Sequence, residues 1–134
     1  MTTRMPLIAG NWKMYKDVSE SVQTADRLKE LIKGVAGVEV MIAPTFPALF
    51  QVSEALRGSL ISIGAQNMHW EEQGAFTGEV SPAMLRDAGC RYVIVGHSER
   101  RQLFGETDEN VNPLLSQFLH RLSHSGQRRN PGSR

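Results

Sequence analysis

The sequence has little of what marks secreted and membrane proteins. It contains one cysteine in 134 residues, Cys90, so no disulfide can form within the chain, which favours a reducing compartment. Its longest early apolar stretch, Met5 to Ala9, is far too short to span a membrane, and the start of the chain shows no signal-peptide pattern. We therefore expect a cytoplasmic protein without a membrane partner, in which Cys90 is a small buried residue rather than a nucleophile.

Cofactor and metal motifs are also missing. The four histidines, at positions 69, 97, 120 and 124, do not have the spacing of metal ligands. Neither the glycines of Gly74 to Gly78 nor Gly105-Glu106 match a phosphate-binding loop or a dinucleotide fingerprint. We expect no cofactor and no metal site.

Acidic residues are absent from the end of the chain. All 14 lie at or before Glu109, so residues 1–112 carry 11 basic and 14 acidic groups, whereas the last 22 residues carry four arginines and a charge of +4. These arginines have no aromatic residues between them, which is typical of a solvated end rather than of a nucleic-acid contact. No nucleic-acid partner is expected, and deleting residues 113–134 would test this.

What is present indicates one globular domain, with 40% hydrophobic and 22% charged residues. Short apolar runs alternate with amphipathic stretches, which predicts βαβ units and a parallel sheet with right-handed crossovers. We predict strands over residues 5–10, 38–43, 60–66 and 92–96. Helices are predicted from an N-cap at Ser19 to Gly34 or Gly37, over 47–56 after a Thr45 cap, over 82–88 after Ser81, around 98–103, and from Thr107.

Residues Tyr92 to Gly96 form a short apolar run rich in β-branched residues and without polar alternation. This predicts a strand buried on both faces, with His97 at its carboxyl end. In α/β folds ligands bind at that edge. Ser98 is a suitable N-cap, and a helix starting there would hold the His97 ring neutral, able to donate a hydrogen bond to a developing oxyanion. The alternative is an ordinary structural histidine.

Asn11, Lys13 and Gln66 also fall at or just past predicted strand tips, so they and His97 should share one rim of the sheet. The set suits an anionic substrate with a carbonyl group, because a lysine supplies positive charge and a neutral histidine polarises the oxygen. Lys13 can equally be a solvated lysine. Glu99 can be a helix-dipole or salt-bridge partner, or it can orient Lys13 or move protons.

Several long motifs resemble the triosephosphate isomerase family, in order from about Pro6 to Val111. They are Ala9-Gly10-Asn11-Trp12-Lys13-Met14, Gly64-Ala65-Gln66-Asn67, Gly74-Ala75-Phe76-Thr77-Gly78-Glu79-Val80-Ser81-Pro82, Gly96-His97-Ser98-Glu99-Arg100-Arg101 and Phe104-Gly105-Glu106-Thr107-Asp108. The resemblance implies a (β/α)8 barrel, a cytosolic homodimer, and cofactor-free interconversion of dihydroxyacetone phosphate and glyceraldehyde 3-phosphate in glycolysis and gluconeogenesis.

Carried over residue by residue, the resemblance makes Lys13 the cation near the substrate and His97 the neutral electrophile, with Glu99 also catalytic. Asn11 contacts the substrate, and Ser98 and Glu99 line the pocket.

The resemblance also suggests a dimer interface. The loop from Asn67 to Gly78 has no helical or strand period, and its Phe76, Thr77 and Gly78 would reach across to the partner subunit. Gln66 is assigned to the same interface, and Arg100 and Glu106 resemble a structural ion pair near it.

A barrel of this type has eight strands and about 250 residues, and only four strands are visible here. Residues 1–112 are therefore predicted to form the amino-terminal half of a barrel. Residues 113–134 carry no family motif and are expected to form a helix to about Ser123 and then a disordered basic end. The change at Asn112 suggests a shifted reading frame or an artificial junction, which sequencing the encoding DNA would test.

The general-base glutamate, the lid and the phosphate loops of the family have no counterpart, so we expect the chain alone to be nearly inactive. The competing hypothesis is a non-catalytic half-barrel that associates with itself, with an intact subunit or with a complementary half.

Overall fold

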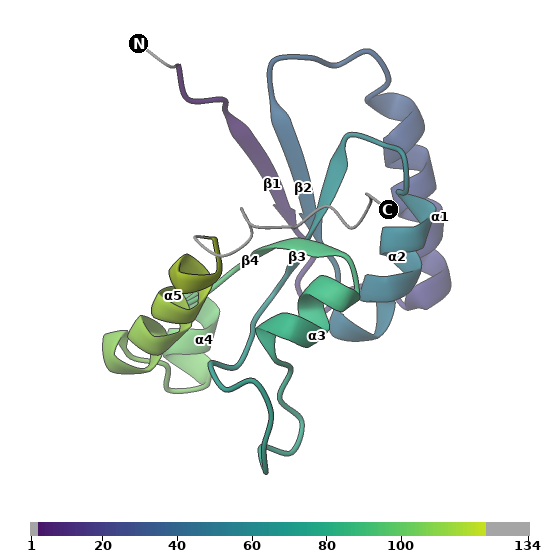
Figure 1. Ribbon diagram of the computed structural model, residues 1–134. Coiled ribbons are helices and arrows are strands. Elements are labelled where there is room, and N and C mark those ends of the chain that lie inside the picture. Colours follow the sequence, from purple (N-terminus) through teal and green to yellow (C-terminus); the bar gives the residue numbers. More distant parts are fainter. Residues whose placement is uncertain (1–2, 123–134) are drawn as a thin grey trace, which may run out of the picture.

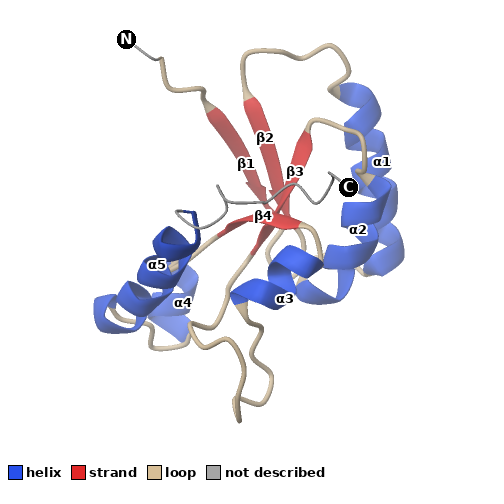
Figure 2. Ribbon diagram, viewed as in Figure 1, coloured by secondary structure: helices blue, strands red, loops and turns tan. Residues whose placement is uncertain are grey.

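The computed structural model describes residues 3–122 and has a four-stranded parallel sheet at its centre (Figures 1 and 2). The strands β1 (Leu7–Asn11), β2 (Glu39–Ala43), β3 (Ile61–Ala65) and β4 (Cys90–Val93) lie side by side in sequence order. Helices and turns connect them, as the alternating pattern predicts. The predicted fold class, an α/β half-barrel, is confirmed.

The connections contain α1 (Val18–Leu31), the short 3-10 helix η1 (Phe46–Ala48), α2 (Leu49–Ala55) and α3 (Pro82–Asp87). Two helices, α4 (Ser98–Leu103) and α5 (Asp108–Leu122), follow β4. The helix predicted up to about Ser123 is thus part of one helix that begins at Asp108. The predicted disordered end, residues 126–134, lies outside the described residues.

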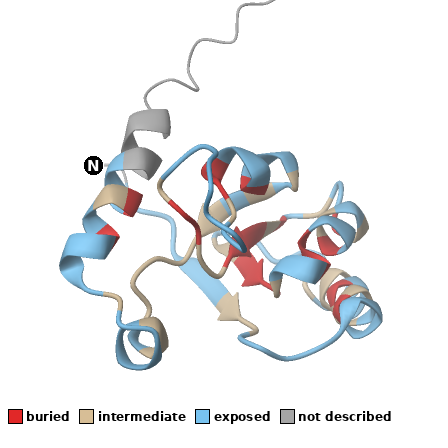
Figure 3. Ribbon diagram, turned by 90° about the horizontal axis from the view of Figure 1, so that it is seen from below, coloured by how far each residue is buried: buried red, intermediate tan, exposed pale blue. Residues whose placement is uncertain are grey.

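Most of the core lies between the sheet and the helices α1, α2 and α3, and Leu114 of α5 belongs to the same cluster; buried segments are red in Figure 3. The strand residues in the cluster come from β2 and β3, where Ile61, Ile63 and Ala65 alternate along β3 as expected for one face of a sheet. The buried cluster consists of Ala25, Ile42, Ala48, Leu49, Val52, Leu56, Ile61, Ile63, Ala65, Met68, Leu85 and Leu114.

The middle of the sheet is built around a close approach between Met41 and Gly64. A Cβ at Gly64 would lie 2.6 Å from the Met41 sulfur, so a glycine at this position lets the Met41 side chain cross β3. The Tyr92 hydroxyl of β4 donates to the Glu39 carboxylate of β2. That hydrogen bond raises the pKa of Tyr92.

Several predicted boundaries were wrong by a few residues. Asp17, not Ser19, caps α1, because Asp17 and Glu20 form a reciprocal capping box. Strand β4 begins at Cys90 rather than Tyr92, since its pairing with β3 starts there, and the chain turns away at Gly96, which has a φ of +61°. Thr45 precedes η1, but its side chain makes no capping hydrogen bond.

Two sheet edges are open within the described part of the chain, since β1 and β4 each pair on one side only. On β1, Leu7 and Ile8 are 44% and 59% exposed. No helix within residues 3–122 is both long and apolar enough to cross a membrane.

Candidate active site

A cavity of about 340 Å³ lies beyond the carboxyl ends of the strands. It brings together six of the predicted site residues, which come from the ends of β1 and β3 and from the start of α4: Asn11, Lys13, Gln66, His97, Glu99 and Arg100. The remaining wall is formed by Met14, Thr45, Phe46, Pro47, Asn67 and Phe104.

His97 is held by the first turn of α4. Its Nδ1 accepts a hydrogen bond from the backbone N–H of Glu99 at 3.1 Å, so His97 itself is the N-cap, and the predicted Ser98 cap was wrong. An imidazole nitrogen can accept here in the same way as a capping carbonyl oxygen. Because Nδ1 accepts, the proton of the neutral ring lies on Nε2, which is then a hydrogen-bond donor.

Gly96 sets the position of His97. Its φ of +61° suits glycine, and a Cβ there would lie 3.0 Å from both the Val111 side chain and the Arg101 guanidinium. Arg101 Nε also donates to the Gly96 carbonyl at 2.8 Å. The turn that presents the histidine is therefore closed by contacts from α4 and α5.

Lys13 and Glu99 form an ion pair at the cavity wall, with Nζ and Oε1 2.6 Å apart. The hydrogen bond between them raises the pKa of Lys13 and lowers that of Glu99. The other Glu99 oxygen lies 3.7 Å from His97 Nδ1. Both partners are about half exposed, so the pair contributes little to stability, and its effect is to hold the ammonium group at the cavity wall.

Not all predicted site residues meet in this cavity. Ser98 is exposed and does not line it, and neither do Phe76, Thr77 and Gly78 of the loop that follows β3. Phe76 instead packs on His69 of its own loop, with ring centroids 4.4 Å apart.

Glu106 also lies outside the cavity wall, where it pairs with Arg100. One of its oxygens, Oε1, is buried without a partner among the described residues. The ion pair expected from the family resemblance is therefore present within one chain, and its place at an interface stays a prediction.

The sequence did not lead us to predict the part of the cavity wall formed by the residues after β2. Thr45, Phe46 and Pro47 come directly after Ala43, the last residue of that strand. The same rule that selected His97 and Gln66, proximity to a carboxyl strand end, would have found them.

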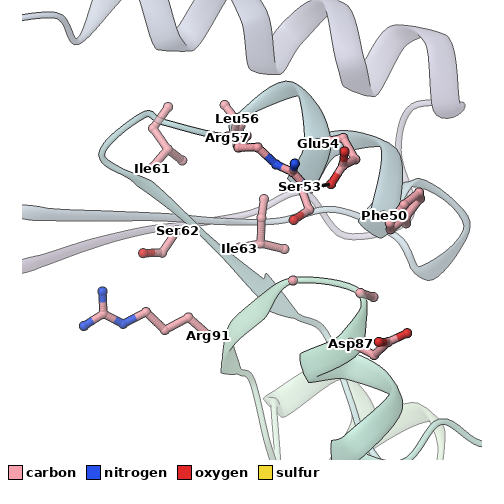
Figure 4. A pocket seen from close by; sticks show the side chains of 12 residues that line it. Phe50, Ser53, Glu54, Leu56, Arg57, Ile61, Ser62, Ile63, Asp87 and Arg91 are labelled. Carbon is pink, nitrogen blue, oxygen red and sulfur yellow. Dashed lines mark hydrogen bonds and ion pairs between the residues drawn. The ribbon is translucent and has the colours of Figure 1, made fainter. Parts of the chain in front are cut away.

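A second cavity, of about 350 Å³, lies near the amino-terminal ends of β3 and β4, between α2 and the α3–β4 turn (Figure 4). Its wall contains Arg57 and Glu54, which pair with each other at 2.5 Å, as well as Asp87 and Arg91. It contains no histidine and lies at the opposite end of these strands from His97, so the first cavity is the better candidate despite its similar size.

A match to a protein-family model shows which family the chain belongs to. The family model described as triosephosphate isomerase matches residues 6–122. The chain belongs to the triosephosphate isomerase family. The match extends past Val111 and includes α5, while the proposed boundary at Asn112 remains a prediction.

Individual triosephosphate isomerases are similar to this chain in both sequence and structure. The one from Pelobacter propionicus is 66% identical over 109 residues, which cover 81% of this chain and 43% of that protein. The one from Carboxydothermus hydrogenoformans is 62% identical over 112 residues, covering 84% and 45%. The crystal structure of triosephosphate isomerase from Bartonella henselae superposes with a TM-score of 0.81 at 34% identity, covering 87% of this chain and 48% of that one. The chain thus spans less than half the length of these relatives.

Proposed function

We propose that this chain supplies the electrophilic half of a triosephosphate isomerase site, which interconverts dihydroxyacetone phosphate and glyceraldehyde 3-phosphate through an enediolate without a cofactor. The observation that carries the proposal is the hydrogen bond from Glu99 N–H to His97 Nδ1, which leaves the proton of the neutral ring on Nε2, in a cavity that the Lys13–Glu99 pair also lines. Family membership supports the same reaction.

In this proposal the substrate's carbonyl faces His97 and its anionic end is attracted by Lys13. When a base removes the proton from the carbon next to the carbonyl, negative charge develops on the oxygen. A hydrogen bond from His97 Nε2–H and the field of the ammonium stabilise that charge in the transition state. Asn11 contributes its side-chain amide as a further neutral donor.

The base has to come from outside residues 3–122. Among the described residues that line the cavity, Glu99 is the one carboxylate, and Lys13 lowers its pKa, which makes it a poor proton acceptor for a carbon acid. This agrees with what the family resemblance implies, namely that the general base is a glutamate on a later strand. We therefore expect almost no turnover by the chain alone.

A coupled dehydrogenase assay tests this proposal in two parts. The chain alone should give no glyceraldehyde 3-phosphate above the buffer rate, whereas the chain fused to the remaining part of the Pelobacter propionicus relative should turn over. In the fusion, His97→Gln and Lys13→Met should each remove most of the activity. An active fusion that tolerates both changes would contradict the assignment, and full activity of the chain alone would contradict the need for an external base.

The proposed working form is a cytoplasmic homodimer in which Phe76, Thr77 and Gly78 contact the partner subunit. Support comes from the family resemblance and from the exposure of this loop, in which Phe76 is 43% exposed. Phe76→Ala, Thr77→Ala and Gly78→Ala should each shift a dimer toward monomer in analytical ultracentrifugation.

A second candidate function is association without catalysis, through the sheet edges. The open edge at β1, with Leu7 and Ile8 exposed, favours it, because an unpaired parallel strand can pair with another chain. Light scattering, followed by co-purification with the complementary half, tests this. A monodisperse monomer that captures no complementary half would exclude it.

A further inference from the structure

The backbone at Lys13 adopts an unusual conformation. Its φ is +54°, and within residues 3–122 only one other non-glycine residue, Lys16, has a positive φ. For a residue with a Cβ, this left-handed region costs about 1–2 kcal/mol, so contacts around the peptide must hold it there. The residue in this conformation is the one whose ammonium group meets Glu99 at the cavity wall.

Two side chains hold the Lys13 peptide groups from both sides. Asn11 Oδ1 accepts from the Lys13 N–H at 2.9 Å, which closes a local turn. Gln66 Nε2 donates to the Lys13 carbonyl at 2.8 Å and to the Ala43 carbonyl at 2.9 Å. Gln66 therefore reaches from the end of β3, past the end of β2, to the segment that follows β1.

The Ala43 carbonyl also accepts from the backbone N–H of Trp12 at 3.1 Å. The Ala43 carbonyl at the end of β2 thus binds both the Asn11–Trp12 peptide and the Gln66 side chain that holds the Lys13 carbonyl. A glutamine amide carries two N–H donors, and both are directed at backbone carbonyls. The Gln66 side chain consequently has no N–H left for a substrate, although the residue lines the cavity.

We propose that Gln66 is a positioning residue for Lys13: its amide clamps the left-handed turn and thereby holds the ammonium group at the cavity wall beside Glu99 and His97. This inference rests on the proposed function in so far as Lys13 is the cation that meets the substrate. It assigns Gln66 a role within one chain, separate from the interface contact that the family resemblance suggests.

Loss of the clamp has a defined consequence. Without the two hydrogen bonds, Lys13 can relax to the negative φ that is usual for residues with a Cβ. That change redirects the Cα–Cβ bond, so Nζ leaves Glu99, and the pKa of each partner returns toward its ordinary value. Because a charged hydrogen bond is lost, inorganic phosphate or dihydroxyacetone phosphate should bind about tenfold more weakly.

The test compares Gln66→Met, which keeps the length of the side chain and removes both donors, with Gln51→Met on the exposed surface of α2. NMR of the full chain would follow the φ of Lys13 through its scalar couplings, the Lys13 pKa through the Cε resonance, and the dissociation constant of inorganic phosphate. We expect Gln66→Met to reverse the sign of φ, lower the Lys13 pKa and weaken phosphate binding about tenfold, with Gln51→Met unchanged.

A folded Gln66→Met chain with an unchanged Lys13 φ and pKa overturns the proposal. If that variant does not fold, Gln66→Asn keeps an amide that is one methylene too short to bridge both carbonyls, and it should give the same changes. The φ and pKa measurements need no substrate. Failure of the unsubstituted chain to bind triose phosphate, together with loss of the positive φ of Lys13 in the Gln66→Met variant, is therefore an interpretable pair of results. That pair of results would refute the proposed function and leave the clamp supported.

Discussion

Replacing His97 separates its structural role from its chemical one. Its Nδ1 accepts from the Glu99 N–H at 3.1 Å, and this satisfies one of the free donors at the start of α4, a helix of six residues. His97→Ala removes that acceptor. His97→Asn keeps one, because asparagine is among the strongest N-cap residues, but it has no imidazole.

The expected difference between the two variants is the value of the cap, about 1 kcal/mol, in favour of His97→Asn. The lost ring packing is common to both variants and cancels in the comparison. Such a difference corresponds to about a fivefold change in an equilibrium constant. Local opening of α4 should therefore be about five times more frequent in His97→Ala than in His97→Asn.

Amide hydrogen exchange at Glu99 measures this opening directly, and urea denaturation gives the matching stability difference. Turnover by each variant, measured in the fusion with the remaining part of the Pelobacter propionicus relative, should be equally low because neither has the Nε2–H donor. Equal exchange at Glu99 in the two variants would refute the cap, and normal turnover by the His97→Asn fusion would refute the electrophilic role.

Three further predictions concern the ion pair, the thiol and the core. The stability from the Lys13–Glu99 pair is fully present above the ordinary glutamate pKa of 4.5 and is lost as pH falls through the lowered pKa of Glu99. Urea midpoints of wild type and Glu99→Gln should therefore converge in acid, and a difference that persists at pH 2 would contradict the pair. Burial raises the pKa of Cys90 to about 11, so alkylation at pH 8 should be about 10²-fold slower in the native chain than in urea, and similar rates would show that the thiol is not buried. Leu49→Ala, at a site only 3% exposed, should lower the unfolding free energy by about 2–5 kcal/mol. Leu31→Ala, at 70% exposure, should change it by about 0.5 kcal/mol or less, and equal losses would contradict the assigned core.

Much of the fold could be predicted because its signals are local. Apolar runs such as Val38 to Ala43, followed by Pro44, mark a strand and its end without knowledge of any neighbour. Once the strands are parallel, their carboxyl ends must share a rim, so the grouping of Lys13 with His97 follows from topology alone. The family motifs lead to the same arrangement.

The details that could not be predicted depend on contacts between distant segments. Ser98 and His97 can both cap a helix, and the choice is made by the turn at Gly96, which packs against Val111. The left-handed backbone conformation of Lys13 likewise could not be predicted from the neighbouring sequence, because Gln66, 53 residues further on, supplies one of its hydrogen bonds. Local residue preference alone argues against such a conformation for a lysine.

A triose phosphate site at the carboxyl ends of the strands is tested most directly by an NMR titration of the full chain with dihydroxyacetone phosphate. We expect saturable shifts at Lys13, Glu99 and His97 in the first cavity, and none at Arg57 and Arg91 of the second. Saturable shifts confined to Arg57 and Arg91, or no shifts at any substrate concentration, would contradict a triose phosphate site at the carboxyl ends of the strands.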